Sequence, residues 1–200
     1  MADTKISDLT AMSAFDTSAD LAVVVDTSAT ETKRCTLNQL ADAIATRLGI
    51  NERDYAQAYV SSASASASIT SGTYVNVLAN STIADEGGTG ADWTIDDTNK
   101  RITYIGTNNV NVYVTCSVSM TSSTSNQVAS FRVAKNGTTV AASQIDRKIG
   151  TGSDVGALSI THIFEDLSTN DYIELWATLD TSSQTITPNQ CHMQVVPLVG

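Results

Sequence analysis

The clearest structural signal in the sequence is the stretch VNVYVTCSV at residues 110–118. Every second side chain is apolar, and the side chains between them are polar except for Tyr113. Because successive side chains of a β-strand point to opposite faces, this alternation predicts a strand with one face turned toward a core. A slip by one residue would turn the apolar side chains to water, so the pattern also specifies the register of the strand.

Short runs with the same alternation, separated by turn signals, extend from residue 73 to the end of the chain. Asn136-Gly137 lies between two of them, and both residue types tolerate the positive φ that a two-residue hairpin requires. Many short strands at this spacing are typical of an antiparallel β-sandwich. The predicted strands span residues 73–78, 93–96, 101–105, 110–120, 129–135, 138–143, 157–165, 171–180 and 191–198.

The first fifty residues have a different character. An apolar strand at residues 21–26, a polar turn and a second strand at 32–36 predict a hairpin. A helix follows, because Thr36 and Gln39 have the spacing of a capping box. Apolar residues then recur at helical spacing until Gly49, and they are Leu37, Leu40, Ala41, Ile44 and Leu48.

Between these regions the sequence carries little to bury. Ser and Ala alternate at residues 61–68, and no large apolar side chain occurs among them. We therefore predict a small α+β segment at residues 1–50, a linker at 51–70 and a β-sandwich domain at 71–200.

The charge of the chain excludes several functions. The net charge is −10, with 11 Lys and Arg against 21 Asp and Glu, and no basic run is present to neutralise phosphates. We therefore predict no binding to nucleic acid. The longest apolar run, residues 21–25, is far shorter than the ~20 residues of a membrane-spanning helix, so no membrane partner is predicted. The three cysteines are widely spaced and odd in number, which favours buried thiols over a disulfide framework.

Motifs that carry chemistry are missing from the sequence. Neither His162 nor His192 has a Cys or carboxylate at a metal-ligand spacing. The glycines at residues 87–90 are not followed by the Lys-Ser or Lys-Thr pair of a phosphate-binding loop. A β-turn accounts for Asp96, Asp97 and Asn99 as well as a calcium-binding site does. We therefore predict no catalytic residue, no metal site, no cofactor and no enzymatic activity.

The aromatic residues favour an oligomer. In the predicted strand 171–180, one face is apolar, whereas the other face combines Tyr172 and Trp176 with polar side chains. Tyr and Trp are enriched where proteins bury surface against a partner. Together with Tyr113 on the polar side of its own strand, they predict an oligomer interface.

The N-terminal segment resembles the virion-docking module of many phage tail-fibre and head-decoration proteins. The resemblance rests on KISDL at residues 5–9, ADLAVVVD at 19–26 and KRCTLNQL at 33–40, and on their order and spacing. It implies that this segment attaches to the phage particle. The docking side chains would be Ile6, Leu9, Leu37 and Leu40.

The second half resembles the jelly-roll superfamily of tumour necrosis factor and the complement globular heads, which recurs in phage trimers. The resemblance rests on the Asn136-Gly137 hairpin after residues 131–135, on LSTNDYIEL at 167–175 and on the final apolar strand. Asn170 departs from the pattern, because the family often has glycine there. The resemblance implies a homotrimer around an axis along the inner sheet, with Tyr172, Trp176 and Tyr113 at the interface.

These features predict a trimeric capsid decoration (cement) protein that is made in the host cytoplasm and located in the virion. Its partner would be the major capsid protein or another virion protein. The alternative is a trimeric tail or head fibre that binds a host-surface receptor through loops such as residues 87–92 and 148–156. A third reading, a glycan hydrolase, requires two acidic residues facing each other across a groove.

Overall fold

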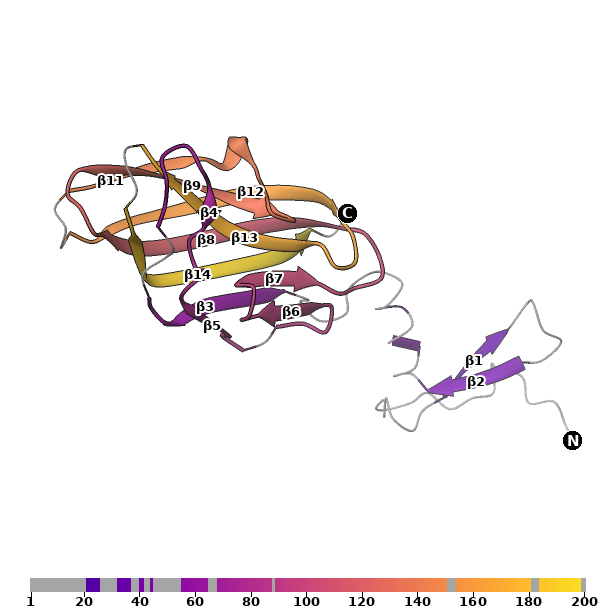
Figure 1. Ribbon diagram of the computed structural model, residues 1–200. Coiled ribbons are helices and arrows are strands. Elements are labelled where there is room, and N and C mark those ends of the chain that lie inside the picture. Colours follow the sequence, from indigo (N-terminus) through magenta and orange to yellow (C-terminus); the bar gives the residue numbers. More distant parts are fainter. Residues whose placement is uncertain are drawn as a thin grey trace, which may run out of the picture. The chain divides into compact units, whose positions relative to one another are not determined.

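The computed structural model describes residues 21–25, 32–36, 40, 41, 44, 55–64, 68–87, 89–150, 154–180 and 184–198. The chain divides into two units, Met1–Asn51 and Glu52–Gly200, and each is described by itself (Figure 1).

The first unit contains an antiparallel hairpin of β1 (Leu21–Val25) and β2 (Thr32–Thr36). Leu21 lies opposite Thr36 and Val25 lies opposite Thr32, which confirms the predicted hairpin. Leu40, Ala41 and Ile44 have helical backbone, as the capping-box pattern predicts. The rest of the predicted helix, with Leu37, lies outside the described residues, as do Ile6 and Leu9.

The second unit is a sandwich of two antiparallel sheets. One sheet has five strands in the order β12-β8-β14-β3-β5, and Figure 1 shows β14, β3 and β5 side by side. Its strands are β12 (Gly156–Leu167), β8 (Val110–Ser122), β14 (Ile186–Leu198), β3 (Ala56–Ser62) and β5 (Thr82–Asp85).

The other sheet has seven strands, with the main order β10-β9-β13-β7-β6. Two short strands complete it, since β11 (Ile145–Ile149) pairs with β9 and β4 (Val75–Asn76) pairs with β13. The remaining strands are β10 (Thr138–Thr139), β9 (Gln127–Lys135), β13 (Tyr172–Leu179), β7 (Arg101–Tyr104) and β6 (Trp93–Asp96).

The chain alternates between the two sheets. It passes from β7 to β8 and back to β9, and later from β11 to β12, β13 and β14, changing sheet at each step. The last strand, β14, then pairs with β3, the first strand of the unit. This order is that of a jelly roll, which confirms the predicted mainly β fold.

The core lies between the sheets. On β8, Val112, Val114, Cys116 and Val118 are buried, in the register that the alternation of this strand predicts. They belong to one continuous cluster that includes Phe131 on β9 and other buried side chains of both sheets. On strands such as β8, which bury every second residue, the alternate residues lie on the outer face of the sheet.

The predicted linker at residues 51–70 is wrong over Ala56–Ser62. This segment is β3, a central strand with β14 on one side and β5 on the other. Ala56, Ala58 and Val60 are buried. The strand is held by backbone pairing on both edges, and its small side chains fill the core without producing a strong apolar signal in the sequence.

Other boundaries differ at the edges of the second sheet. The predicted strand 73–78 is reduced to β4, and the strand predicted at 138–143 ends at Thr139, before a 3-10 turn at Ala141–Ser143. The sequence analysis missed β5 and β11. β11 reads IDRKI and leaves four of its five residues exposed, so it lacks the apolar alternation of a half-buried strand.

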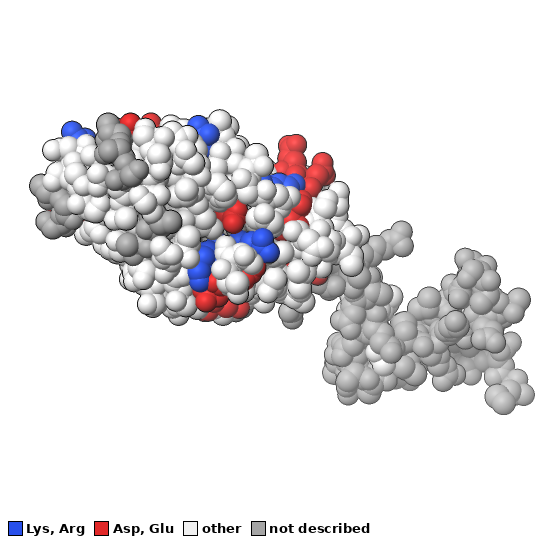
Figure 2. Space-filling model, viewed as in Figure 1, with Lys and Arg blue, Asp and Glu red and all other residues white. Residues whose placement is uncertain are grey.

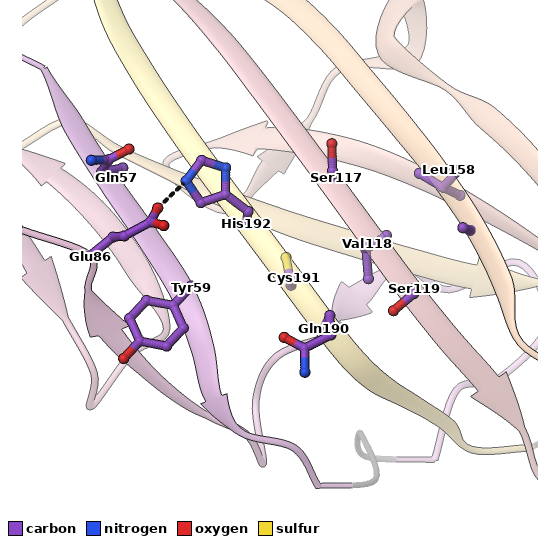
Figure 3. Close-up of a pocket in the computed structure, with 11 residues that line it drawn as sticks. Gln57, Tyr59, Glu86, Ser117, Val118, Ser119, Leu158, Gln190, Cys191 and His192 are labelled. Carbon is purple, nitrogen blue, oxygen red and sulfur yellow. Dashed lines mark ion pairs between the residues drawn. The ribbon is translucent and has the colours of Figure 1, made fainter.

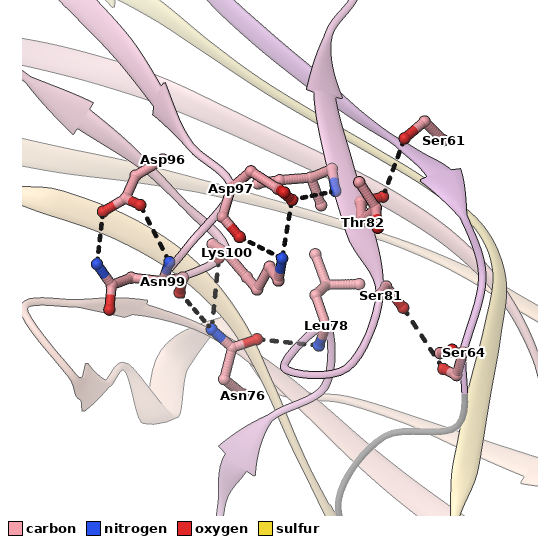
Figure 4. A network of polar contacts seen from close by, with 11 residues as sticks. Ser61, Ser64, Asn76, Leu78, Ser81, Thr82, Asp96, Asp97, Asn99 and Lys100 are labelled. Atoms are coloured by element: carbon pink, nitrogen blue, oxygen red, sulfur yellow. Dashed lines mark hydrogen bonds and ion pairs between the residues drawn. The ribbon is translucent and has the colours of Figure 1, made fainter.

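A polar network surrounds the turn between β6 and β7 (Figure 4). Asp97, in the turn between β6 and β7, accepts a 2.7 Å hydrogen bond from the Ile83 N–H of β5, so its carboxylate connects the two sheets. It also forms a 2.8 Å ion pair with Lys100. The hydrogen bonds from Lys100 and Ile83 lower the pKa of Asp97. Asp96 accepts from the backbone and side chain of Asn99, so contacts within the turn occupy both aspartates.

Candidate functional site

The aromatic residues predicted at the oligomer interface do not share one face. Tyr113 lies on β8 in the five-stranded sheet, between the buried Val112 and Val114, and therefore points outward. Tyr172 and Trp176 lie on β13, on the outer face of the other sheet. The structure brings Tyr172 and Trp176 together on one surface and places Tyr113 on another, so the three predicted interface residues do not form one continuous patch.

Trp176 already has partners within the chain. Its neighbours across the sheet are Arg132 on β9 and Asn76 on β4. Its indole Nε1 donates a 3.0 Å hydrogen bond to Glu174 Oε2, and Asn76 Nδ2 donates to the other oxygen at 3.3 Å. Glu174 is only 7% exposed, so this outward carboxylate depends on Trp176 and Asn76 for its hydrogen bonds.

Cations cover the two tyrosines of the same surface. The guanidinium of Arg101 lies 4.1 Å from the centre of the Tyr172 ring, and that of Arg132 lies 4.3 Å from the centre of the Tyr74 ring. Both distances are within the range of cation–π attraction. The polar and aromatic side chains named on this surface therefore already have partners within the chain.

The outer face of the five-stranded sheet has a different composition. Its large apolar side chains are exposed, with Tyr59 and Tyr113 at 38% and Ile163 at 51%. Ser, Thr, Asn, Gln and His fill most of the remaining outward positions. We call this set of residues the uncharged face. They are Gln57 and Tyr59 on β3, Asn111, Tyr113, Thr115, Ser117 and Ser119 on β8, Ala157, Ser159, Thr161 and Ile163 on β12, and Gln190, His192, Gln194, Val196 and Leu198 on β14.

The strand register arranges these residues in rows across the sheet. Val196, Tyr113 and Ile163 form an apolar row, since Tyr113 lies opposite Val196 on β14 and opposite Ile163 on β12. Tyr59, His192 and Ser117 form another row across β3, β14 and β8. Ionisable side chains are few on this face: His192 lies on β14, and Glu165, which follows Ile163 at the next outward position of β12, is an exposed carboxylate at one end of it. On the side of the molecule seen in Figure 2, acidic and basic side chains gather in a few clusters and leave most of the described surface uncharged.

A shallow groove of about 770 Å³ crosses the uncharged face (Figure 3). His192 projects into it from β14, and its Nε2 atom lies 2.7 Å from Oε2 of Glu86, the residue that follows β5. The Nε2 atom itself is covered, whereas the side chain as a whole is 39% exposed. The groove is lined further by Gln57, Tyr59, Ser117 and Gln190.

The described residues contain no group of three or more His, Cys, Asp or Glu side chains that is placed to hold a metal ion. No helix among them is long and apolar enough to cross a membrane. His162 packs its ring edge-on against Phe164, with 4.8 Å between the ring centres.

Two of the three cysteines are buried, as predicted, and the structure places them in contact with each other. Cys116 and Cys191 lie on the neighbouring strands β8 and β14, with their Sγ atoms 3.8 Å apart, and both are free thiols. Contact with Cys191 and burial raise the pKa of the Cys116 thiol. The side chain of Cys35 lies outside the described residues.

Sequence reasoning missed most of the uncharged face. It identified Tyr113 but not Tyr59, because Tyr59 falls in the segment that was predicted to be a linker. The alternation AQAYV at residues 56–60 was the available signal. The contact between Glu86 and His192 joins residues far apart in the sequence, and no motif marks it.

Comparison with known proteins gives only distant structural likenesses. No protein-family model matches the sequence, and no curated protein matches it. Among solved structures, the PRD1 vertex protein P5 is similar with a TM-score of 0.42 and 12% identity over 74% of this chain and 98% of that one. Eiger TNF from S. frugiperda has a TM-score of 0.40 and 10% identity over 73% and 94% of the two chains. Murine APRIL at pH 5.0 has a TM-score of 0.44 and 10% identity over 72% and 99%.

Proposed function

We propose that this protein is a non-enzymatic structural component of a phage particle, namely a capsid decoration (cement) protein that assembles as a homotrimer. The observation that carries the trimer is the uncharged face on the five-stranded sheet. The attachment role rests on the N-terminal sequence, which resembles a virion-docking module.

The composition of the uncharged face suits contact between identical chains. The chain has a net charge of −10, so copies repel one another unless they meet where the charge is absent. The uncharged face carries its carboxylates only at its edges, at Glu86 after β5 and at Glu165 near the end of β12. Between them it exposes Tyr59, Tyr113 and Ile163. Enrichment in aromatic side chains and depletion of charge are typical of the core of a protein interface.

The row of Val196, Tyr113 and Ile163 is the strongest candidate for the centre of the interface. Its members are adjacent on three neighbouring strands, so they form one continuous apolar strip. Burying such a strip removes apolar area from water at roughly 25 cal/mol per Å². Trp176 and Tyr172 contribute less to this proposal, because Trp176 has partners in Glu174 and Asn76 and Tyr172 has one in Arg101.

In the proposed arrangement, residues 1–50 bind the major capsid protein or another virion protein. Ile6, Leu9, Leu37 and Leu40 would supply the apolar contacts, and Leu40 is the one whose burial the structure describes, as partly buried. A decoration protein of this kind stabilises the shell by mass action, since it binds only the assembled state.

The trimer is tested by changing one side chain on the uncharged face. Tyr113→Asp places a carboxylate in the apolar strip and is expected to convert the trimer to a monomer, because the buried charge would be unpaired. The matched control is Ile145→Asp on β11, which is also an exposed apolar residue, at 41%, but belongs to the other sheet. Native mass spectrometry and circular dichroism report the mass and the folding of each variant.

A wild-type monomer at micromolar concentration contradicts the proposed trimer, and an unchanged mass for Tyr113→Asp contradicts the choice of face. Cryo-electron microscopy of the particle tests the location. Copies distributed over the head support a decoration protein, whereas a few copies on the tail support the alternative, a fibre that binds a host-surface receptor.

A further inference from the structure

His192 lies in the middle of the uncharged face and is the histidine among the residues that define it. Its partners across the sheet are Tyr59 on β3 and Ser117 on β8. Histidine is the side-chain type that most often serves as a pH switch in proteins, because its charge is sensitive to its surroundings.

Glu86 is the charged group that faces His192. Its Oε2 atom lies 2.7 Å from His192 Nε2, and its side chain is 51% exposed. The other titratable residues lining the groove are Tyr59 and Cys191, and Cys191 contacts the buried Cys116 thiol. No Lys or Arg lines the described groove, so His192 is the cation that the groove offers to Glu86.

The protonation of His192 therefore determines the net charge of this pair. When His192 is protonated, the pair is neutral overall. When His192 is neutral, Glu86 remains as an uncompensated carboxylate at the edge of the face. Removing an unpaired carboxylate from water costs much more free energy than removing a paired one.

We propose that assembly of the trimer through the uncharged face is linked to the uptake of a proton by His192 in each subunit. This inference rests on the proposed trimer. The protonated pair with Glu86 is the form that enters the interface, so the association constant rises as the pH falls through the range in which histidine titrates. Linkage limits the effect to about tenfold per histidine for each pH unit.

The test is the association constant of the full chain, measured by analytical ultracentrifugation between pH 5.5 and pH 8.5, a range of roughly one to two units on each side of the histidine pKa. The wild type is expected to associate more tightly at the acid end. His192→Gln is expected to lose this dependence. Glu86→Gln is expected to reverse it, because the imidazolium then lacks a partner and the neutral imidazole enters the interface more readily.

The matched control is His162→Gln, which removes the other histidine of the chain. His162 lies on β12 beside Phe164 and does not line the groove, so this variant is expected to keep the wild-type dependence. If His192→Gln does not fold, the pH dependence of the association constant of Glu86→Gln tests the proton linkage instead. The linkage predicts that the sign of this dependence is reversed relative to the wild type.

The possible results test the proton linkage, the proposed trimer, or both. A trimer with the same association constant at every pH overturns the proton linkage and leaves the proposed function standing. A dependence that survives in His192→Gln, or that keeps its wild-type sign in Glu86→Gln, also overturns the linkage. A wild-type monomer at every pH overturns both the trimer and the inference that rests on it.

Discussion

Asn136 donates a 2.6 Å hydrogen bond from Nδ2 to Oδ1 of Asp171, and this bond joins the turn after β9 to the turn before β13. The amide oxygen of Asn136 accepts from the Tyr172 N–H at 3.0 Å. Asp171 in turn accepts from the Ser168 N–H and pairs with Lys135 at 2.9 Å. The two turns therefore form one polar unit.

Replacing Asn136 by Ala is expected to destabilise the sandwich by about 0.5–1.5 kcal/mol, because the exposed hydrogen bonds of its amide to Asp171 and Tyr172 are lost. Asn136 also has a φ of 54°, which Ala adopts less readily. Asn136→Gly is the control, since glycine accepts this φ but lacks the amide. Urea denaturation of both variants separates the two contributions. Wild-type stability in Asn136→Ala would contradict the role of the hydrogen bonds.

Asp171 is expected to make stability depend on acid pH. Burial works against its ionised form, but hydrogen bonds from Asn136 and the Ser168 N–H, together with Lys135, outweigh burial and lower the pKa of this carboxyl. A lowered pKa stabilises the folded state above the unfolded value of about 3.9, and this stabilisation is lost as the pH falls through the folded value.

The measurement compares the urea midpoints of the wild type and Asp171→Asn from neutral pH to pH about 2, below the ordinary carboxyl pKa. The difference between the two proteins is expected to be constant near neutral pH and to shrink in acid. A difference that grows as the pH falls would contradict the lowered pKa.

The strand β3 is expected to be indispensable for folding. A chain of residues 52–200 retains it, whereas a chain of residues 71–200 leaves the backbone of β14 and β5 unpaired on one side. The longer chain is expected to unfold cooperatively on heating, and the shorter one is expected to lack a cooperative transition. Cooperative unfolding of the 71–200 chain would show that β3 is not needed for folding. Residues 51–70 would then act as the linker that the sequence predicts.

The thiols of Cys116 and Cys191 are expected to be unreactive in the folded protein. Both are buried, and the pKa of Cys116 is raised by contact with Cys191 and by burial, so little thiolate is present. In a Cys35→Ser background, a thiol reagent is expected to label both residues only after denaturation. Rapid labelling of the native protein would show that the two strands separate readily.

The sequence predicts best those strands whose side chains alternate strictly. The strand at residues 93–96 was predicted to the residue as β6, and the register of β8 was predicted from its valines. β3 escaped detection because backbone pairing with two neighbours, rather than large side chains, defines it. The proximity of Glu86 and His192 also escaped, since it follows from the sheet order β14-β3-β5 and not from any local pattern.

Pairing of β3 with β14 determines when, during folding, the five-stranded sheet is complete. Ala56 lies opposite Val195, so the two neighbours come from distant parts of the chain, and the sheet is complete only after every intervening strand is available. Folds dominated by such distant pairings fold slowly. The surface proposed for self-association spans both strands, so subunits are expected to acquire their affinity for one another only after each has finished folding.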